Sequence, residues 1–207
     1  MTILVDNDIL FKVAALDLLD SLPELLDARL PSIHVLDSIP YYPLKNPKVE
    51  ENCGAVAIER TLAFVEDLPK LGEEDVPDAP FDRLIGQEGI DVGEAILFAA
   101  ATQFNPVWVV TGDKNSLRAL HGSDCSEVID EMSRCVICFE RLILGFIEVF
   151  DYTLVCERVA SAPSIDRVLN DIAFTDGVDT PQERVQAALQ SKRNSLIDET
   201  GTLLLDT

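Results

Sequence analysis

The chain has 207 residues, of which 47% are hydrophobic and 26% charged, values that exclude an intrinsically disordered protein. Its formal net charge of −21, from 37 acidic and 16 basic residues, opposes general nucleic-acid binding, which needs clustered lysine and arginine. No apolar run reaches the roughly 20 residues that span a bilayer, and the start MTILVDND lacks the basic region of a secretory signal. We therefore expect a cytoplasmic protein with no membrane partner.

The first part of the sequence predicts strands and helices in alternation. The apolar residues 2–5 (TILV) predict a short buried strand, and helical spacing of apolar residues predicts a helix over 11–22. A second strand is expected at 32–36, and an amphipathic helix over 55–68. Between these two, residues 39–47 contain three prolines, which predicts a loop or a cover.

The middle of the sequence continues this alternation. A polar linker (72–80) precedes an alanine-rich helix over 92–104, and the apolar run 107–111 (VWVVT) is typical of a central parallel strand. A short helix is expected over 114–122, and residues 134–144 predict another buried strand that runs on toward a helix. This pattern predicts an α/β fold, a three-layer α/β/α sandwich with a mainly parallel central sheet.

The pattern changes near residue 151, after which no strong strand signal appears. We expect an α/β domain over 1–150 and a helical C-terminal extension over 151–207. Within the extension, Thr180 as the N-cap, Pro181 at the first helical position and Glu183 at the third predict the start of a helix.

The five cysteines indicate reduced thiols, because their number is odd and no export signal is present. Cys135 and Cys138 form the one close pair. Residues three apart on a strand point to opposite faces, so these two thiols cannot share a metal ion. With only His34 and His121 in addition, the sequence favours core cysteines over a zinc site.

Three acidic residues each lie where an apolar run meets a helix signal: Asp6, Glu94 and Asp113. The carboxyl ends of parallel strands form one edge of a sheet, so acids from separate strand–helix units can converge there. Carboxylates held close together resist joint ionisation unless a counter-charge is present. For oxygen ligands the usual counter-charge is a hard divalent cation, Mg²⁺ or Mn²⁺. The sequence therefore predicts a metal site built from these three residues.

Each of these acids also has an ordinary structural explanation. Asp6 and Asp113 precede helices, where an N-cap residue stabilises the helix by about 1 kcal/mol. Asp91 and Glu94 have the spacing of a capping box, with Asp in place of Ser or Thr. Capping and metal binding are therefore alternatives for each acid alone. Three acids at equivalent junctions favour the metal site.

Three short motifs surround these acids in order along the chain. The run Asp6-Asn7-Asp8 lies in VDNDIL, Gly93-Glu94-Ala95 lies in DVGEAILFAAAT, and Thr111-Gly112-Asp113 lies in WVVTGDKNSLRAL. In this order and spacing the motifs resemble those of the PIN domain family, over about residues 2–149. In that family an Asp ends the first strand, a later helix opens with an acid, and a Thr-x-Asp signature follows an apolar strand.

This resemblance implies a PIN-type endoribonuclease that depends on Mg²⁺ or Mn²⁺ and hydrolyses phosphodiester bonds in an RNA substrate with a metal-activated water. It implies Asp6 as the central metal ligand, with Glu94 and Asp113 as direct or water-mediated ligands. Thr111 would orient Asp6 or the attacking water, and Lys114 would contact a substrate phosphate. Many members of the family are toxins paired with an antitoxin, so a protein inhibitor is a further expected partner.

Two features depart from the family pattern. The family's additional acid, on the helix after the second strand, is matched here by Glu59 or Glu66, which lie on roughly one helix face. Asp8 replaces the family's Asn two positions after the first Asp. This replacement either adds a ligand or marks a site that no longer serves a nuclease.

Two other functions are alternatives. The first is a catalytically inactive PIN-like module that binds a protein, for which a basic partner would match the net charge of −21. The second is a haloacid-dehalogenase-like phosphatase with Asp6 as the nucleophile and Asp8 as the general acid. Asp176 and Asp179 would form its final acidic pair, although no suitably placed lysine precedes them.

Overall fold

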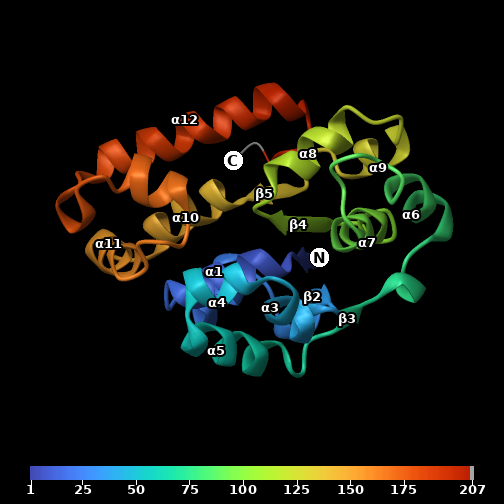
Figure 1. Ribbon diagram of the computed structural model, residues 1–207. Helices are drawn as coiled ribbons and strands as arrows, with labels where there is room; N and C mark the ends of the chain where they lie inside the picture. Colours follow the sequence, from blue (N-terminus) through green and yellow to red (C-terminus); the bar gives the residue numbers. More distant parts are fainter. Residues whose placement is uncertain (206–207) are drawn as a thin grey trace.

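Residues 1–205, which the computed structural model describes, fold around a sheet with the strand order β3-β2-β1-β4-β5 (Figure 1). The strands are β1 (Thr2–Val5), β2 (Ile33–Leu36), β3 (Lys70–Leu71), β4 (Val107–Thr111) and β5 (Val136–Cys138). Every strand pair is parallel, which confirms the predicted parallel α/β sheet. The central strand β1 is apolar on both faces, because helices cover both sides of the sheet.

Two helical layers enclose the sheet, as predicted for a three-layer sandwich. Side chains alternate along β1, so Ile3 and Val5 face one layer whereas Leu4 faces the other. The first layer contains α1 (Asn7–Ala15), α5 (Ala55–Val65), α10 (Phe139–Val149) and α11 (Tyr152–Ala160). The second contains α6 (Asp78–Leu84), α7 (Val92–Ala101), α8 (Lys114–His121) and α9 (Ser126–Glu131). Within residues 1–205, no helix combines the length and the apolar character that a membrane span requires.

The first helix begins and ends earlier than the predicted range 11–22. The chain turns from β1 into α1 at Asp6, so the helix starts at Asn7. Asp17 then takes a positive φ of 54°, which interrupts the helical run. The short segments η1 (Leu19–Ser21), α2 (Leu22–Leu25) and η2 (Leu30–Ser32) lead from there to β2.

Residues 39–53 are largely helical, so of the predicted loop or cover over 39–47 the loop is wrong. They form η3 (Ile39–Tyr41), α3 (Tyr42–Lys45) and α4 (Pro47–Cys53). Each of the three prolines lies in the first turn of one of these segments. A first-turn N–H has no helical partner and the fixed φ of proline suits a helix, so proline is favoured there. The prolines therefore start short helices rather than prevent them.

The stretch 72–80 is more than the predicted linker. Immediately before this stretch lies the strand β3, which pairs with β2 through Val35↔Lys70 and Leu36↔Leu71. The stretch itself contains η4 (Glu73–Asp75) and the beginning of α6. A strand of two residues is too short to show a periodic apolar pattern in the sequence. The strand β3 is recognisable only through its pairing with β2.

The strand β5 is shorter than the predicted strand over 134–144. It ends at Cys138, and the chain passes directly into α10, most of whose residues are buried. An apolar run by itself does not separate a buried strand from a buried helix. All five cysteines have free thiols, and Cys138 is buried in β5 whereas the half-buried Cys135 precedes the strand.

The part of the chain after residue 150 packs on the α/β core through α12 (Gln182–Thr200), after η5 (Val168–Ala173) and η6 (Gly177–Asp179). Val185 and Leu189 of α12 join the buried cluster on the first face of the sheet. Beyond the helix, Leu204 forms a parallel bridge with Val136 of β5. The boundary near residue 150 stays a prediction, and residues 206–207 of the predicted extension lie outside the described part of the chain.

The predicted N-cap of the last helix is wrong by one residue. Pro181 is the cap residue, and its neighbour Thr180 makes no capping hydrogen bond. The Thr180 hydroxyl instead accepts a hydrogen bond of 3.0 Å from the backbone N–H of Asp176. Its carbonyl accepts one of 2.5 Å from the Tyr152 hydroxyl. Thr180 therefore secures the turn before the helix.

Candidate functional site

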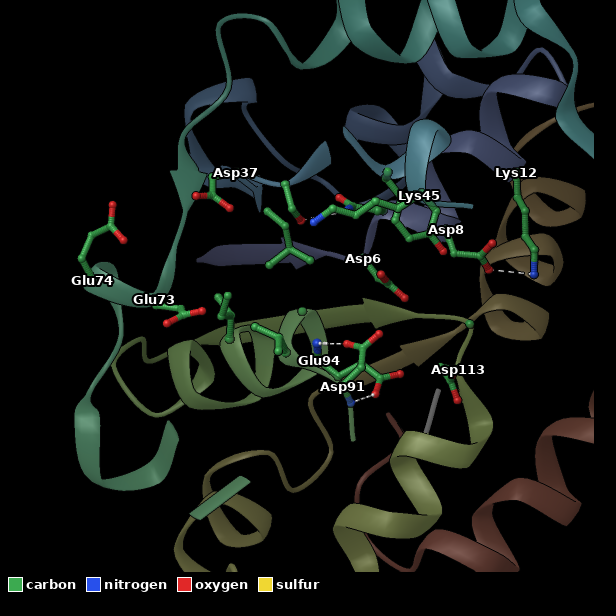
Figure 2. Close-up of a pocket in the computed structure, with 18 residues that line it drawn as sticks. Asp6, Asp8, Lys12, Asp37, Lys45, Glu73, Glu74, Asp91, Glu94 and Asp113 are labelled. Carbon is green, nitrogen blue, oxygen red and sulfur yellow. Dashed lines mark hydrogen bonds and ion pairs between the residues drawn. The ribbon is translucent and has the colours of Figure 1, made fainter. Parts of the chain in front are cut away.

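A cavity of about 830 Å³ opens at the carboxyl ends of β1, β2 and β4 (Figure 2). Asp6 follows β1, Asp37 follows β2, and Asp113 follows β4 after one glycine. Glu94 reaches the same cavity from the first turn of α7. The fold therefore brings together the three acids that the sequence singled out, at the edge where parallel sheets bind ligands.

The carboxylate of Asp6 is held by a hydrogen bond from β4 rather than by helix capping. Asp6 is the N-cap residue of α1, but its side chain makes no capping hydrogen bond. The Thr111 hydroxyl donates a hydrogen bond of 3.1 Å to Oδ2 of Asp6. The backbone N–H of Asp113 donates to the Thr111 hydroxyl oxygen, also at 3.1 Å. Thr111 is thus placed to orient Asp6, as the resemblance implied.

The other two acids do cap helices. Oδ1 of Asp113 accepts hydrogen bonds of 2.8 Å and 2.9 Å from the backbone N–H groups of Asn115 and Ser116. Asp91 and Glu94 form the predicted capping box, with reciprocal side chain–backbone hydrogen bonds of 2.9 Å and 2.8 Å. The capping explanation is therefore confirmed for Asp113 and Glu94, and for Asp6 it is wrong.

Capping leaves part of each carboxylate available. Oδ1 of Asp6, Oδ2 of Asp113 and Oε1 of Glu94 accept no hydrogen bond from any residue in the described range 1–205. None of the three carboxylates has a lysine or arginine as an ion-pair partner within that range. Each acid therefore offers one oxygen, still uncompensated, to whatever enters the cavity.

Burial and like charge make ionisation of two of these acids difficult. Burial, followed by the nearby carboxylates of Asp8 and Asp91, raises the pKa of Asp6 from 3.8 to about 7, although the Thr111 hydrogen bond opposes the shift. Burial is also the largest cause for Glu94, whose pKa rises from 4.5 to about 8 with further contributions from Asp91 and Asp113. A raised pKa of a carboxyl group means that its charged form lacks compensation. A cation in the cavity would supply it.

Beside these acids lies a group of ion pairs, which we call the flank: Asp8 with Lys12, and Glu140 with Lys114. The acids of the flank have cationic partners. Lys12 lies 2.9 Å from Oδ2 of Asp8 and 3.1 Å from Oδ2 of Asp166. Burial alone would lower the pKa of Lys12, but the two carboxylates outweigh it and raise the pKa above its ordinary value. Lys114, the predicted phosphate contact, forms an ion pair with the buried Glu140 instead of pointing freely into the cavity.

The remaining acids fall partly inside and partly outside the cavity. Asp8 lines it, whereas Glu59 and Glu66 are exposed on or just after α5 and are not among its lining residues. Asp37 was not predicted, although this residue follows β2 just as Asp6 follows β1. Glu140 was not predicted either, because it lies in the first turn of α10, directly after β5, and has no separate sequence signal. Further acids of the cavity are Glu73, Glu74 and Asp91.

The donor atoms of the cavity suit a hard divalent cation, because they are carboxylate oxygens. Asn7 adds an amide: the residue is 1% exposed and lines the cavity, and its side-chain oxygen, Oδ1, has no hydrogen-bond partner. Among residues 1–205, no three Asp, Glu, His or Cys side chains are already gathered around one point as metal ligands. Carboxylates without a counter-charge repel one another, so a spread arrangement is expected before a cation binds.

The residues of the phosphatase alternative do not assemble. Asp6 and Asp8 line the cavity, but Asp176 and Asp179 do not. Asp176 forms an ion pair of 3.0 Å with Arg184, and Asp179 lies in η6 near the start of α12. The sequence has no match among protein-family models, curated proteins or solved structures.

Proposed function

We propose that this protein is a divalent-cation-dependent endoribonuclease of the PIN type, which hydrolyses phosphodiester bonds at the acidic cavity. The observation that carries the proposal is the convergence of Asp6, Glu94 and Asp113 on one cavity from three separate elements. Their order along the chain is the order of the PIN motifs.

The charge of the cavity supports a cationic ligand. Its lining contains two lysines, Lys12 and Lys45, and Lys12 is already shared between Asp8 and Asp166. The eight acids of the lining are Asp6, Asp8, Asp37, Glu73, Glu74, Asp91, Glu94 and Asp113. Such an excess of carboxylates favours an ion of high positive charge, which interacts with several of them at once.

Each side chain has a role that follows from its contacts. Asp6 is the central ligand, and the hydrogen bond from Thr111 fixes the orientation of its carboxylate. Asp113 and Glu94 each bind through the oxygen that capping leaves free, so the helix N-termini hold both side chains in position. A bound Mg²⁺ or Mn²⁺ would supply an activated water and neutralise the charge that develops on the phosphoryl group.

The test is cleavage of RNA by the purified protein with Mg²⁺, with Mn²⁺ and with EDTA. We expect cleavage only with a divalent cation, and a loss of about 100-fold or more in Asp6→Asn, as is typical when a group that stabilises the transition state is removed. The matched control is Asp82→Asn, because Asp82 is an exposed acid on α6 outside the cavity. Equal activity of Asp6→Asn and the wild type would refute the proposal.

A second reading is also supported by a specific observation. Glu94 and Asp113 both cap helices, so capping alone can account for these two side chains. This observation is compatible with an inactive PIN-like module that binds a protein partner, such as a basic inhibitor or antitoxin. Thermal unfolding separates the two readings, because a cation that binds only the folded state must raise the melting temperature. The module predicts no such rise with Mn²⁺, whereas the nuclease predicts a rise that Asp6→Asn abolishes.

A further inference from the structure

The basic side chains of this protein are few, and most of them are engaged. The sequence has 16 lysines and arginines against 37 acids. In the described part of the chain, four of these cations form neither an ion pair nor a side-chain hydrogen bond: Arg29, Lys45, Lys48 and Lys192. A free cation on so acidic a protein is a place where a polyanion meets the least repulsion.

Two of the four free cations flank the acidic cavity. Lys45, at the end of α3, lines it together with Asp6 and Asp8 (Figure 2). Lys48, in the first turn of α4, lines an adjoining cavity of about 430 Å³. The two cavities share Asp8 and Lys12 as lining residues, so they adjoin each other. The two free lysines therefore lie on neighbouring cavities that border the same acid.

The same segment exposes apolar side chains beside the lysines. Tyr41 is 60% exposed and Leu44 is 80% exposed. Tyr41, Leu44 and Lys45 have the i, i+3, i+4 spacing that places residues on one face of a helical segment. The neighbouring Tyr42 stacks on Phe11, with ring centroids 5.8 Å apart and ring planes 9° apart, and this contact anchors the segment to α1.

Free lysines next to an exposed aromatic ring are the pattern that binds a single nucleic-acid strand. The cations contact phosphates, and the ring stacks on a base whatever its sequence. In a duplex the bases are already stacked on one another, so the ring would have no base face to contact. A protein ligand would not require that Lys45 and Lys48 lie beside the cavity proposed to hydrolyse phosphodiester bonds. Single-stranded RNA fits all of these features together.

We infer that residues 41–48 bind a single-stranded segment of the RNA substrate and lead it into the acidic cavity. Lys45 and Lys48 contact successive phosphates, and Tyr41 stacks on a base. This inference rests on the proposed nuclease function, because it names the substrate path to that site.

Binding is measured by fluorescence anisotropy with a labelled single-stranded oligoribonucleotide of about 12 nucleotides, which is within the usual range of site sizes. Every protein carries Asp6→Asn and is assayed with Mg²⁺, so that the RNA stays intact. The test variant is Lys45→Glu/Lys48→Glu. The matched control is Arg29→Glu/Lys192→Glu, which changes the other two free and exposed cations and gives the same net charge.

The test variant should bind at least about tenfold more weakly than the parent, with a slope of log K against log salt that is smaller by about 1.4, or about 0.7 per phosphate contact on a single strand. The affinity of the control should stay within about twofold of the parent, because the net charge of the protein is expected to influence binding much less than the two lysines at the cavity. Tyr41→Ala should weaken binding about fivefold or more, whereas Tyr41→Phe keeps the stacking surface and the affinity.

Three results would overturn the inference. The first is an equal loss in the test variant and the control, which would show an effect of net charge alone. The second is tighter binding of a duplex of the same sequence. The third is no RNA binding by the parent, which would leave a protein as the occupant of the segment.

Cleavage assays separate the inference from the proposed function. In proteins with Asp6 intact, divalent-dependent cleavage with an unchanged KM in Lys45→Glu/Lys48→Glu would reject the path and keep the nuclease. RNA binding that depends on Lys45 and Lys48 without any divalent-dependent cleavage would reject the nuclease and keep the binding segment.

Discussion

The centre and the flank of the acidic cavity treat their carboxylates in opposite ways. On the flank, Asp8 is paired with Lys12, and the buried Glu140 is paired with Lys114. At the centre, Asp6 and Glu94 have no cationic partner in the described chain, and each has a pKa well above its ordinary value. The two regions are neighbours, since a smaller cavity beside Glu140 shares residue Asp113 with the larger one.

The comparison shows how a strongly acidic chain divides its few cations. The ion pairs of the flank connect separate elements. Lys12 of α1, for example, pairs with Asp8 of the same helix and with Asp166, which lies just before η5. The centre receives no such neutralisation, and its charge stays available for a cation from solution. We therefore expect the flank to serve stability and the centre to bind a cation, and four predictions test this division.

The largest expected effect follows from breaking the buried pair on the flank. Lys114→Ala leaves Glu140, whose side chain is 3% exposed, without its partner. Removing one member of a buried pair is strongly destabilising, so we expect the free energy of unfolding in urea to fall by about 3 kcal/mol. Lys192→Ala, at an exposed lysine without a partner, should stay within about 0.5 kcal/mol of the wild type. A similar small change in Lys114→Ala would show that the flank is not structural.

The second prediction concerns Lys12, which is less buried than Glu140 and holds two acids. Lys12→Met keeps an unbranched side chain but removes the charge, and with it the contact of the ammonium group with the Phe139 ring, whose centroid lies 5.0 Å from Nζ. We expect a loss of about 2 kcal/mol of stability, because Asp8 and Asp166 then repel each other without a counter-charge. Hydrogen exchange should also increase at Val168 and Leu169, whose backbone N–H groups donate hydrogen bonds to Oδ1 of Asp166. Unchanged exchange there would contradict the role of Lys12 as a clamp.

The third prediction uses the pH dependence of the centre. In the folded protein the pKa of Asp6 is about 7, against 3.8 when the chain is unfolded, so the stability it contributes is present at low pH and is lost as pH rises through about 7. Asp6→Asn removes this loss. In EDTA, we expect the melting temperature of the variant to exceed that of the wild type by about 4 °C at about pH 8 and to match or fall below it at about pH 4.

The control for this measurement is Asp82→Asn, which removes an exposed acid outside the cavity. Its difference from the wild type should not change with pH. A constant difference for Asp6→Asn as well would mean that Asp6 ionises normally and that the centre is not short of positive charge.

The smallest expected effect separates capping from ligand binding at α7. Glu94→Gln keeps an oxygen that can accept the hydrogen bond from the Asp91 N–H, so stability should hardly change, while the response of the melting temperature to Mn²⁺ should fall. Asp91→Ala should cost about 1 kcal/mol through the lost cap but keep the response to Mn²⁺. A loss of the Mn²⁺ response in both variants would place both acids at the cation.

Much of the central architecture was predictable because it depends on local patterns. The apolar runs of β1 and β4 predicted buried parallel strands, and the capping box at Asp91 and Glu94 was visible in the spacing alone. The rule that identified Asp6 and Asp113, an acid at the carboxyl end of a strand, applies equally to Asp37. Asp37 was therefore predictable from the sequence, although it was not predicted.

Other elements were not predictable, because their environment decides them. The prolines of residues 39–47 suit the first turns of short helices, but the sequence does not show that this segment packs against α1, where Tyr42 stacks on Phe11. The strand β3 exists through its pairing with β2. Thr180 is of a residue type that often caps helices, but its hydroxyl oxygen accepts a hydrogen bond from the backbone N–H of Asp176 instead.

Acids at the carboxyl ends of parallel strands meet at one edge of the sheet because the strands run in one direction, so this convergence follows from the order of strands and acids along the chain. Which acids near the cavity are neutralised depends on the folded structure. Lys12 and Lys114 are close to cavity residues in sequence, yet their partners Asp166 and Glu140 come from later segments that only folding brings near. An ion pair depends on distances of a few ångströms between side chains, and such distances are set by packing rather than by sequence spacing.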